Sequence, residues 1–224
     1  MFESLKLSEI SGRRCEKLRE PSSTRPALWV VEEKGVKAVV KDYSVNGYFY
    51  RNIIGRFLIW RERRAYKKLK GLKGVPVFYR VIDGLALVIE KIPGKNMEGL
   101  KKNERIAEDF FIKLRDLVES FHQRGLVHCD LKRAPNILID QHGDPYLVDW
   151  SASIAKKEFG VFPLSCIYQR FLMDDLNGII KIQLRHCPDK INHEDKQRYY
   201  YRSRIEKFIR GIRDSLRNFL QKVA

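Results

Sequence analysis

The polar residues Asp130, Lys132 and Asn136 lie in one short stretch whose residue types suit phosphoryl transfer. The stretch reads His128-Cys129-Asp130-Leu131-Lys132-Arg133-Ala134-Pro135-Asn136 and leads into an apolar run. An aspartate can accept a hydroxyl proton, and a nearby lysine and asparagine can hold phosphate charge and its counterion. A further aspartate, Asp149, ends the next apolar run, where it can hold Mg²⁺ against the phosphates of ATP. The four residues predict in-line transfer of a phosphoryl group.

Apolar patterns upstream predict the elements that would position these residues. We expect strands from Ala27 to Val31 and from Val36 to Lys41, a helix from Gly47 to Lys70, and strands from Val77 to Asp83 and from Leu85 to Glu90. Pro93 and Gly94 then break the pattern.

The second half is predicted to be helical around one hairpin. A helix is expected from Glu104 to Arg124, ended by Gly125, and strands are expected from Ile137 to Ile139 and from Tyr146 to Val148. Apolar residues from Ile205 to Val223 recur every three or four positions, which predicts a C-terminal helix.

The composition indicates which partners and which cellular compartment we expect for the protein. Of 224 residues, 44 are basic and 28 acidic, and the net charge of +16 favours an anionic partner. The four cysteines are widely spaced, which predicts reduced thiols rather than a disulfide framework or zinc site. The most apolar tract, Ile53 to Trp60, is too short to span a bilayer. We therefore expect a cytoplasmic protein that is soluble or peripheral to the membrane.

The order of elements and motifs resembles the protein-kinase superfamily. That resemblance implies an α+β, two-lobed protein-kinase-like fold with a small β-rich N-terminal lobe at residues 1–92 and a reduced helical C-terminal lobe at residues 93–224. It also implies ATP and Mg²⁺ as cofactors.

In the N-terminal lobe, the resemblance assigns nucleotide contacts to several residues. Lys41 ends a strand similar to V-A-I-K, so it would hold the α- and β-phosphates, and Glu62 would orient it through an ion pair. Glu90 and Ile92 fall at the hinge, where backbone groups would face adenine.

In the C-terminal lobe, the resemblance implies Asp130 as the catalytic base and Lys132 as a contact of the γ-phosphate. Asn136 and Asp149 would be the Mg²⁺ ligands. His128 would be structural and lie under the loop.

The chain departs from the common kinase pattern in four places. Asn136 lies one residue further from Asp130 than usual, Asp149-Trp150-Ser151 replaces D-F-G, and no A-P-E motif occurs in the 75 residues after Asp149. No Gly-rich loop precedes Lys41. Ser22, Ser23 and Thr24 occupy its place, either as a phosphate-binding loop or as an ordinary polar turn.

Asp174 or Asp175, before an expected short helix from Leu176 to Ile180, either buttresses the catalytic loop or is a plain N-cap.

These departures make the chain similar to compact members of the superfamily, the bacterial lipopolysaccharide (heptose or Kdo) kinases and RIO-like kinases. We expect a phosphotransferase acting on a lipid-linked sugar or another membrane-associated hydroxyl. The alternatives are a RIO-like serine/threonine protein kinase and a nucleotide-binding pseudokinase. A glycolipid or phosphorylated sugar is the favoured anionic partner, and nucleic acid is the less favoured one.

The basic segment from Lys196 to Ala224 either lies on an anionic membrane at its inner face, holds nucleic acid, or packs on the helical lobe.

Overall fold

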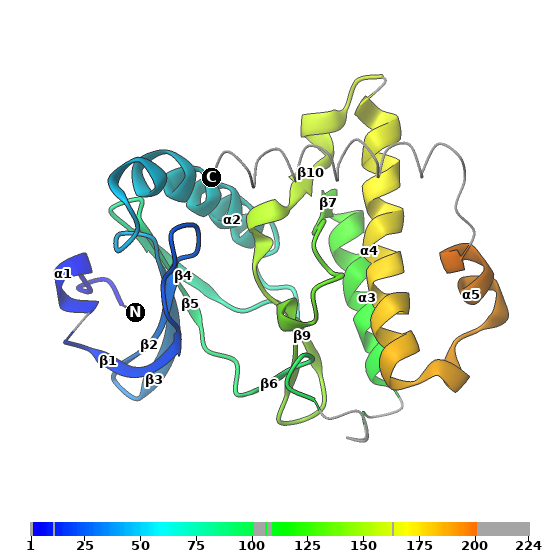
Figure 1. Ribbon diagram of the computed structural model, residues 1–224, viewed down its shortest axis with the longest axis horizontal. Coiled ribbons are helices and arrows are strands. Elements are labelled where there is room, and N and C mark those ends of the chain that lie inside the picture. Colours follow the sequence, from blue (N-terminus) through cyan, green and yellow to red (C-terminus); the bar gives the residue numbers. More distant parts are fainter. Residues whose placement is uncertain (1, 11, 101–105, 107–108, 163, 201–224) are drawn as a thin grey trace. The chain divides into compact units, whose positions relative to one another are not determined.

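The computed structural model describes residues 2–10, 12–100, 106, 109–162 and 164–200 (Figure 1). The chain forms two compact units, Met1–Ile179 and Ile180–Ala224, and the division falls inside helix α4, Leu164–His186. The predicted lobe boundary at residue 92 stays a prediction.

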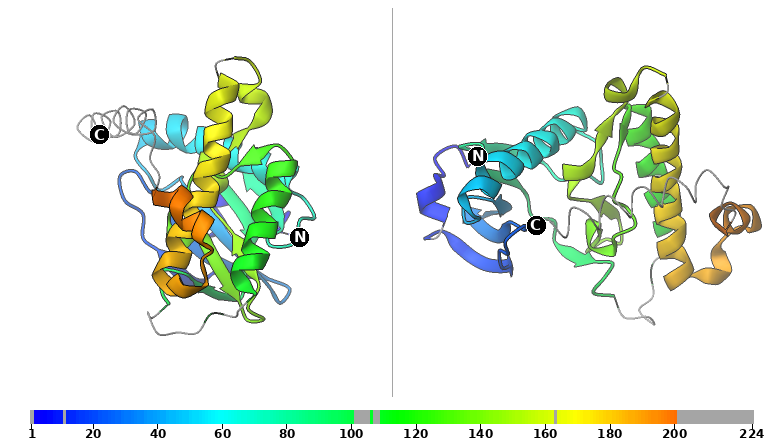
Figure 2. Two further views of the ribbon diagram at one scale, coloured as in Figure 1. Left: turned by 90° about the vertical axis from the view of Figure 1, so that its right-hand side faces the viewer. Right: turned by 45° about the horizontal axis from the view of Figure 1, so that its top comes forward.

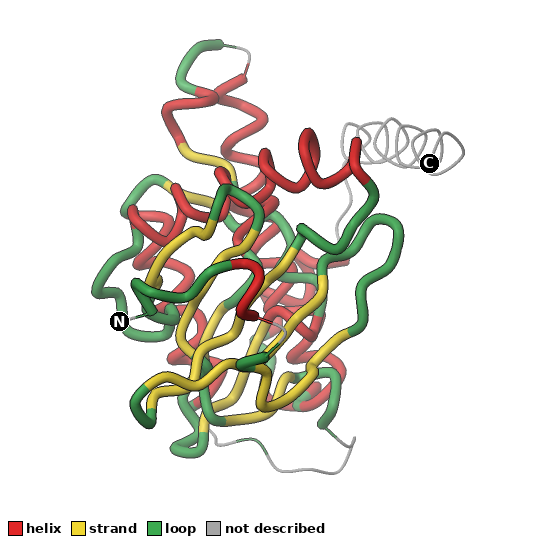
Figure 3. The backbone as a smooth tube through the Cα atoms, turned by 90° about the vertical axis from the view of Figure 1, so that its left-hand side faces the viewer, coloured by secondary structure: helices red, strands yellow, loops and turns green. Residues whose placement is uncertain are grey.

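A five-stranded antiparallel sheet forms the N-terminal part (Figure 3). Its spatial order is β1-β2-β3-β5-β4. The bounds are β1 Arg14–Arg19, β2 Ala27–Glu33, β3 Val36–Asp42, β4 Phe78–Ile82 and β5 Ala86–Glu90. The four strands β2 to β5 were predicted, and the structure confirms them.

The sheet buries a different set of side chains on each face because neighbouring residues of a strand point to opposite sides. One face carries Trp29, Val31, Val40 and Val88, which pack with the N-terminal segment that includes α1, Leu7–Ile10. Lys41 follows Val40 and therefore points to the other face, towards the next helix.

That helix begins as a π-helix, η1 (Tyr50–Gly55), and continues as α2 (Arg56–Lys68). Its buried residues recur every three or four positions and are Ile59, Glu62, Ala65 and Tyr66, which pack against β4 and β5. The predicted helix from Gly47 to Lys70 is confirmed.

The C-terminal part contains two further small sheets. One has the order β6-β8-β9, with β6 Gly94–Asn96, β8 Ile137–Asp140 and β9 Pro145–Leu147. The other pairs β7 Leu126–Val127 with β10 Ile154–Ala155. Short 3-10 helices lie at Ala134–Asn136 (η2), Trp150–Ala152 (η3), Lys156–Phe159 (η4) and Pro188–Lys190 (η5). The predicted hairpin of β8 and β9 is confirmed.

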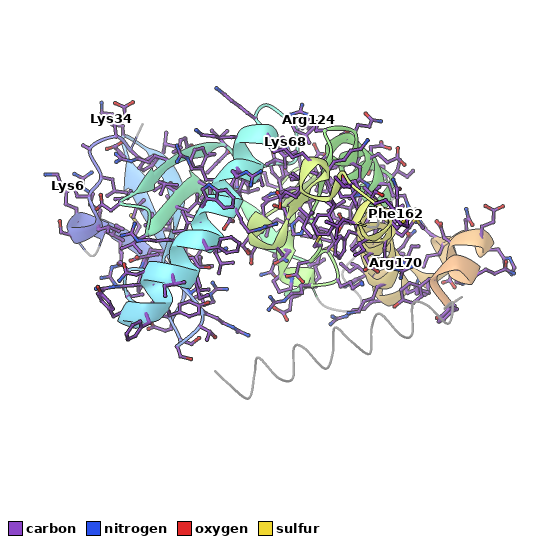
Figure 4. The ribbon with its side chains drawn as sticks, turned by 90° about the horizontal axis from the view of Figure 1, so that it is seen from above. Lys6, Lys34, Lys68, Arg124, Phe162 and Arg170 are labelled. Carbon is purple, nitrogen blue, oxygen red and sulfur yellow. The ribbon has the colours of Figure 1, made fainter. Side chains whose placement is uncertain are left out.

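Helix α3, Phe110–Gln123, is shorter than predicted. Ile106 is not helical, and Glu104 lies outside the described residues. The end of α3 meets the end of α2, where Lys68 Nζ donates to the Gly125 carbonyl and Arg124 donates to the Lys70 carbonyl (Figure 4).

Helix α4 begins at Leu164, so Asp174 and Asp175 lie in its interior and the N-cap alternative is wrong. Figures 1 and 2 show α3 and α4 side by side, and His122 of α3 donates to Asp175 of α4 at 3.1 Å. The second unit also contains α5, His193–Tyr200. The helix predicted from Ile205 to Val223 lies outside the described residues. None of the described helices is long and apolar enough to cross a bilayer.

Candidate active site

The end of β3, the middle of α2 and the end of β9 meet at a buried ion cluster. Lys41 Nζ lies 2.8 Å from Glu62 Oε2 and 2.7 Å from Asp149 Oδ1. The side chains of Lys41 and Glu62 are only 9% and 2% exposed. The structure therefore brings together three residues that the sequence assigned to phosphate and metal binding.

The charges in this cluster stabilise one another. Burial alone would lower the pKa of Lys41, but Glu62 and Asp149 raise it well above its usual value. Burial raises the pKa of Asp149, yet the Lys41 ammonium and the Ser151 hydroxyl together hold it well below its ordinary range. Burial raises the pKa of Glu62, although Lys41 and the backbone N–H of Trp150 lower it. Lys41 and Asp149 are therefore charged at neutral pH.

Asp175 binds the backbone at the start of the stretch from His128 to Asn136. Its Oδ2 accepts a hydrogen bond from the backbone N–H of His128 at 2.7 Å, and its Oδ1 accepts one from Cys129 N–H at 2.9 Å. Asp175 is 1% exposed. Cys129 adopts a φ of 67°, which L-residues rarely adopt, so these hydrogen bonds fix a strained backbone.

His128 connects this loop to the segment after β9 that contains Asp149. Its Nε2 donates to the Val148 carbonyl at 3.0 Å, which leaves Nδ1 as the acceptor of Asp130 N–H at 3.3 Å. The imidazole is buried and lies 4.6 Å from the fully buried Trp150 ring. The predicted structural role of His128 agrees with these contacts.

Asp130 and Asn136 face each other across the loop. Asn136 Nδ2 donates to the carbonyl and to Oδ2 of Asp130, at 3.0 and 3.1 Å. Burial raises the pKa of Asp130 above its ordinary value, while Arg133, 3.5 Å away, and Asn136 lower it. The extra residue between Asp130 and Asn136 is accommodated by a short 3-10 turn at Ala134–Asn136.

Among the described residues, Lys132 pairs with a residue of α4 instead of with the Lys41 cluster. Its Nζ lies 3.1 Å from Asp174 Oδ1, and Asp174 also pairs with Arg170 at 3.4 Å. The predicted contact between Lys132 and a γ-phosphate stays a prediction.

The hinge residues lie at the end of β5. Glu90 N–H donates to the Val77 carbonyl, and Glu90 Oε2 accepts from Val77 N–H at 3.0 Å, so its side chain caps the start of the neighbouring strand. Ile92 is 9% exposed. Their assignment to adenine binding stays a prediction.

The segment with Ser22, Ser23 and Thr24 is a tight turn between β1 and β2, where a phosphate loop would lie. Ser22 and Arg25 form an isolated bridge, and Asn46 Nδ2 donates to both of their carbonyls, at 2.7 and 3.0 Å. Tyr50 donates to the Thr24 carbonyl. The role of Asn46 was not predicted, because an asparagine between a strand and a helix is typical of any turn.

The oxygen atoms of Asp149 and Asn136 are suited to bind Mg²⁺. No cluster of three His, Cys, Asp or Glu side chains suited to a metal occurs among the described residues. Asp149 offers an ionised carboxylate, and Asn136 directs its amide nitrogen to Asp130, so its oxygen is the atom that would bind a cation. One or two protein oxygens completed by phosphate and water are what Mg²⁺ prefers.

The matches to known proteins agree with this geometry. A family model described as the RIO domain matches residues 36–196, which is most of the chain. The chain belongs to the RIO domain family. The matched range of this RIO domain includes Lys41, Glu62, Asp130, Asn136 and Asp149.

Individual relatives of the RIO domain fall into different groups. The chain is 30% identical over 146 residues to serine/threonine-protein kinase PKH1 of Saccharomyces cerevisiae, across 62% of this chain but 19% of that protein. It is 25% identical over 197 residues to 3-deoxy-D-manno-octulosonic acid kinase of Xylella fastidiosa, across 80% of this chain and 76% of that protein. The chain thus spans about a fifth of the yeast kinase.

A solved structure shares the fold. The Rio2 kinase from Chaetomium thermophilum, in an ADP/Mg²⁺-phosphoaspartate complex, superposes with a TM-score of 0.58 at 16% identity, and the match covers 86% of this chain and 63% of that one. The predicted kinase-like fold and the resemblance to lipopolysaccharide and RIO-like kinases are confirmed.

Proposed function

We propose that this RIO domain is an ATP-dependent phosphotransferase whose acceptor is a hydroxyl of a lipid-linked sugar. The observation that carries the proposal is the buried contact of Lys41 with both Glu62 and Asp149, beside a loop that pairs Asp130 with Asn136. Phosphoryl transfer depends mainly on positioned charges, and these residues supply both signs of charge.

Each residue has a defined task in the proposed reaction. The acceptor oxygen bonds to the γ-phosphorus, the bond from that phosphorus to the β–γ bridging oxygen breaks, and ADP leaves with the electron pair. Asp130 accepts the hydroxyl proton. Lys41, oriented by Glu62, binds the α- and β-phosphates. Asp149 and Asn136 would hold Mg²⁺, which would supply neutralisation of the phosphate charge, and Lys132 would turn from Asp174 to the γ-phosphoryl group.

The sugar acceptor is supported by the match to the Kdo kinase, because that alignment spans most of both chains. The net charge of +16 suits an anionic glycolipid or phosphorylated sugar. We propose a cytoplasmic enzyme at the inner face of the membrane. The second candidate, a RIO-type serine/threonine kinase, is supported by the family model and by the fold of Rio2.

The test is transfer of label from γ-labelled ATP with Mg²⁺ into an extract that is then separated into glycolipid, protein and RNA. We expect label in glycolipid, and Asp130→Asn to abolish it while Mg-ATP still raises the unfolding temperature of that variant. Asp116→Asn, an exposed aspartate of α3, is the matched control and should transfer like the parent. Label in protein instead would establish the second candidate. Loss of transfer in both Asp130→Asn and Asp116→Asn, or no transfer of label by the parent, would refute the proposal.

A further inference from the structure

The outer side of the η1–α2 helix is unusually apolar. Among the described residues, seven of the fifteen exposed large apolar side chains lie between Val45 and Trp60. They are Val45, Tyr48, Phe49, Ile53, Ile54, Phe57 and Trp60, here named the outer face. Phe49 is 78% exposed and Ile53 is 63% exposed. A concentration of exposed apolar side chains along one segment is typical of an interaction site.

The spacing places much of the outer face on one helical stripe. Ile53, Phe57, Trp60 and Arg64 follow one another at intervals of four, three and four residues, opposite the buried stripe that contains Glu62. Phe57 and Trp60 stack with ring centroids 5.9 Å apart. The η1–α2 helix therefore has two apolar stripes, one buried in the core and one exposed to solvent.

The rim of the outer face is positively charged. From Gly47 to Lys68 the sequence has seven basic residues and one acidic residue, Glu62, which is buried. Three arginines lie over aromatic rings of the outer face: Arg51 over Tyr48, Arg61 over Phe57 and Arg64 over Trp60, at 5.5, 5.7 and 4.5 Å. Glu158, from η4, offsets part of this charge through Arg61 and Arg64. Arg56, Arg63 and Lys67 remain as exposed cations.

We propose that the outer face docks on an anionic lipid bilayer, with its aromatic and aliphatic side chains in the interface and its basic rim at the headgroups. An exposed aromatic and aliphatic stripe with lysine and arginine beside it is the composition of helices that lie in a membrane surface. The basic rim complements the negative charge of such lipids, each cation adding to the attraction.

Other occupants fit this surface less well. Single-stranded nucleic acid stacks on aromatic rings, but Val45, Ile53 and Ile54 offer no ring to a base. A second copy of the chain would bring two basic rims together and repel. The segment from Arg202 to Lys222 has seven basic and two acidic residues, so its charge also opposes docking here.

The η1–α2 helix also contacts β3 and the β1–β2 turn, which are proposed to bind the nucleotide. Its inner side carries Glu62, the partner of Lys41, and Tyr50 of η1 donates to the Thr24 carbonyl in the β1–β2 turn. Docking through the outer face would therefore hold these elements at the membrane. Binding of the outer face to a bilayer is measured without ATP and is therefore independent of the transfer reaction.

The experiment measures co-sedimentation of the full chain with vesicles of phosphatidylcholine alone and of equimolar phosphatidylcholine and phosphatidylglycerol. We expect binding to the anionic vesicles and weak binding to the neutral ones. Phe49→Ala should lower the partition coefficient roughly 10-fold, because one aromatic side chain leaves the interface. Phe162→Ala is the matched control: Phe162 is 80% exposed in the chain segment before α4 (Figure 4), and its loss should change binding less than about twofold.

A charge pair completes the test. Arg63→Ala with Lys67→Ala should weaken binding to anionic vesicles by about tenfold or more, whereas Lys6→Ala with Lys37→Ala should not. Unchanged melting temperatures show that the variants fold. Binding of Phe49→Ala equal to the parent would overturn the proposal and point to another segment, such as residues 201–224. Equal binding to neutral vesicles, capture by RNA with no vesicle binding, or a dimer that Phe49→Ala dissociates would also overturn it.

Discussion

Replacing Glu62 by glutamine tests whether the buried pair with Lys41 supports both the fold and the nucleotide site. At 2.8 Å and an effective dielectric constant of about 20, the two charges attract by about 6 kcal/mol before desolvation is counted. The variant keeps an amide oxygen in place of the carboxylate, and Lys41 keeps Asp149 at 2.7 Å. The net loss is therefore smaller than for an isolated buried charge, and we expect about 2–3 kcal/mol.

The assay is thermal unfolding at neutral pH without nucleotide, followed by titration with Mg-ATP. For a chain of this length, the loss corresponds to a fall of roughly 5–10 °C in the unfolding temperature. Affinity for Mg-ATP should also fall, because Lys41 is no longer held from the α2 side. Glu158→Gln is the matched control, since Glu158 pairs with Arg61 and Arg64 at 3.4 Å but is 27% exposed, and should lose at most about 0.5 kcal/mol.

Equal unfolding temperatures of Glu62→Gln and Glu158→Gln would refute the stabilising role, because the buried pair would then contribute no more than a surface pair. A Glu62→Gln variant that is destabilised but binds Mg-ATP as the parent does would refute the positioning role, because Glu62 would then not hold Lys41 for phosphate.

Three further changes test other parts of the site. Arg133→Ala should move the acidic limb of the pH–rate profile to higher pH, because Arg133 lowers the pKa of Asp130. In the variant that pKa is higher, so Asp130 becomes protonated, and transfer is lost, at a higher pH than in the parent. An acidic limb at the same pH as in the parent would contradict the assignment of Asp130 as the base. Asp175→Asn should lower the free energy of unfolding by about 2–4 kcal/mol, because an amide cannot accept both loop N–H groups; the neighbouring Asp174→Asn should lose under about 1 kcal/mol, and equal losses in denaturant titrations would refute the loop-holding role. Trp150→Ala should cost about 3–5 kcal/mol in the same titration, because Trp150 is fully buried, and a loss under about 1 kcal/mol would contradict its packing role.

Most of the sheet was predictable because its strands bury apolar side chains in regular patterns. β1 was missed because Arg14–Arg19 is an edge strand whose side chains are almost all polar and exposed, so its sequence has no buried face. The start of α3 was placed too early because Ile106 fits the helical repeat, although its backbone is not helical. Only the part of α4 around Leu176 was expected, because earlier residues such as Gln169 and Arg170 interrupt the apolar pattern.

The residues of the site were predictable where their types and order in the chain carry the signal. Lys41 and Glu62 pair as the resemblance implied, whereas the direct contact of Lys41 with Asp149 was not predicted. Ser151 was noted only as a departure from D-F-G, yet its hydroxyl donates to Asp149 at 2.7 Å. The contact of Lys132 with Asp174 could not be predicted either, because it depends on how a loop and a helix distant in sequence are packed.

The Lys41 cluster has a consequence for how the chain folds as it is synthesised. Glu62 follows Lys41 by 21 residues, but Asp149 follows it by 108. The first pair can close locally, whereas the second must close a long loop against a larger entropy cost. A nascent chain that has emerged only to α3 can therefore form the pair of Lys41 with Glu62 but not the pair of Lys41 with Asp149. Asp149 therefore comes into place only when parts of the chain that are distant in sequence have packed together.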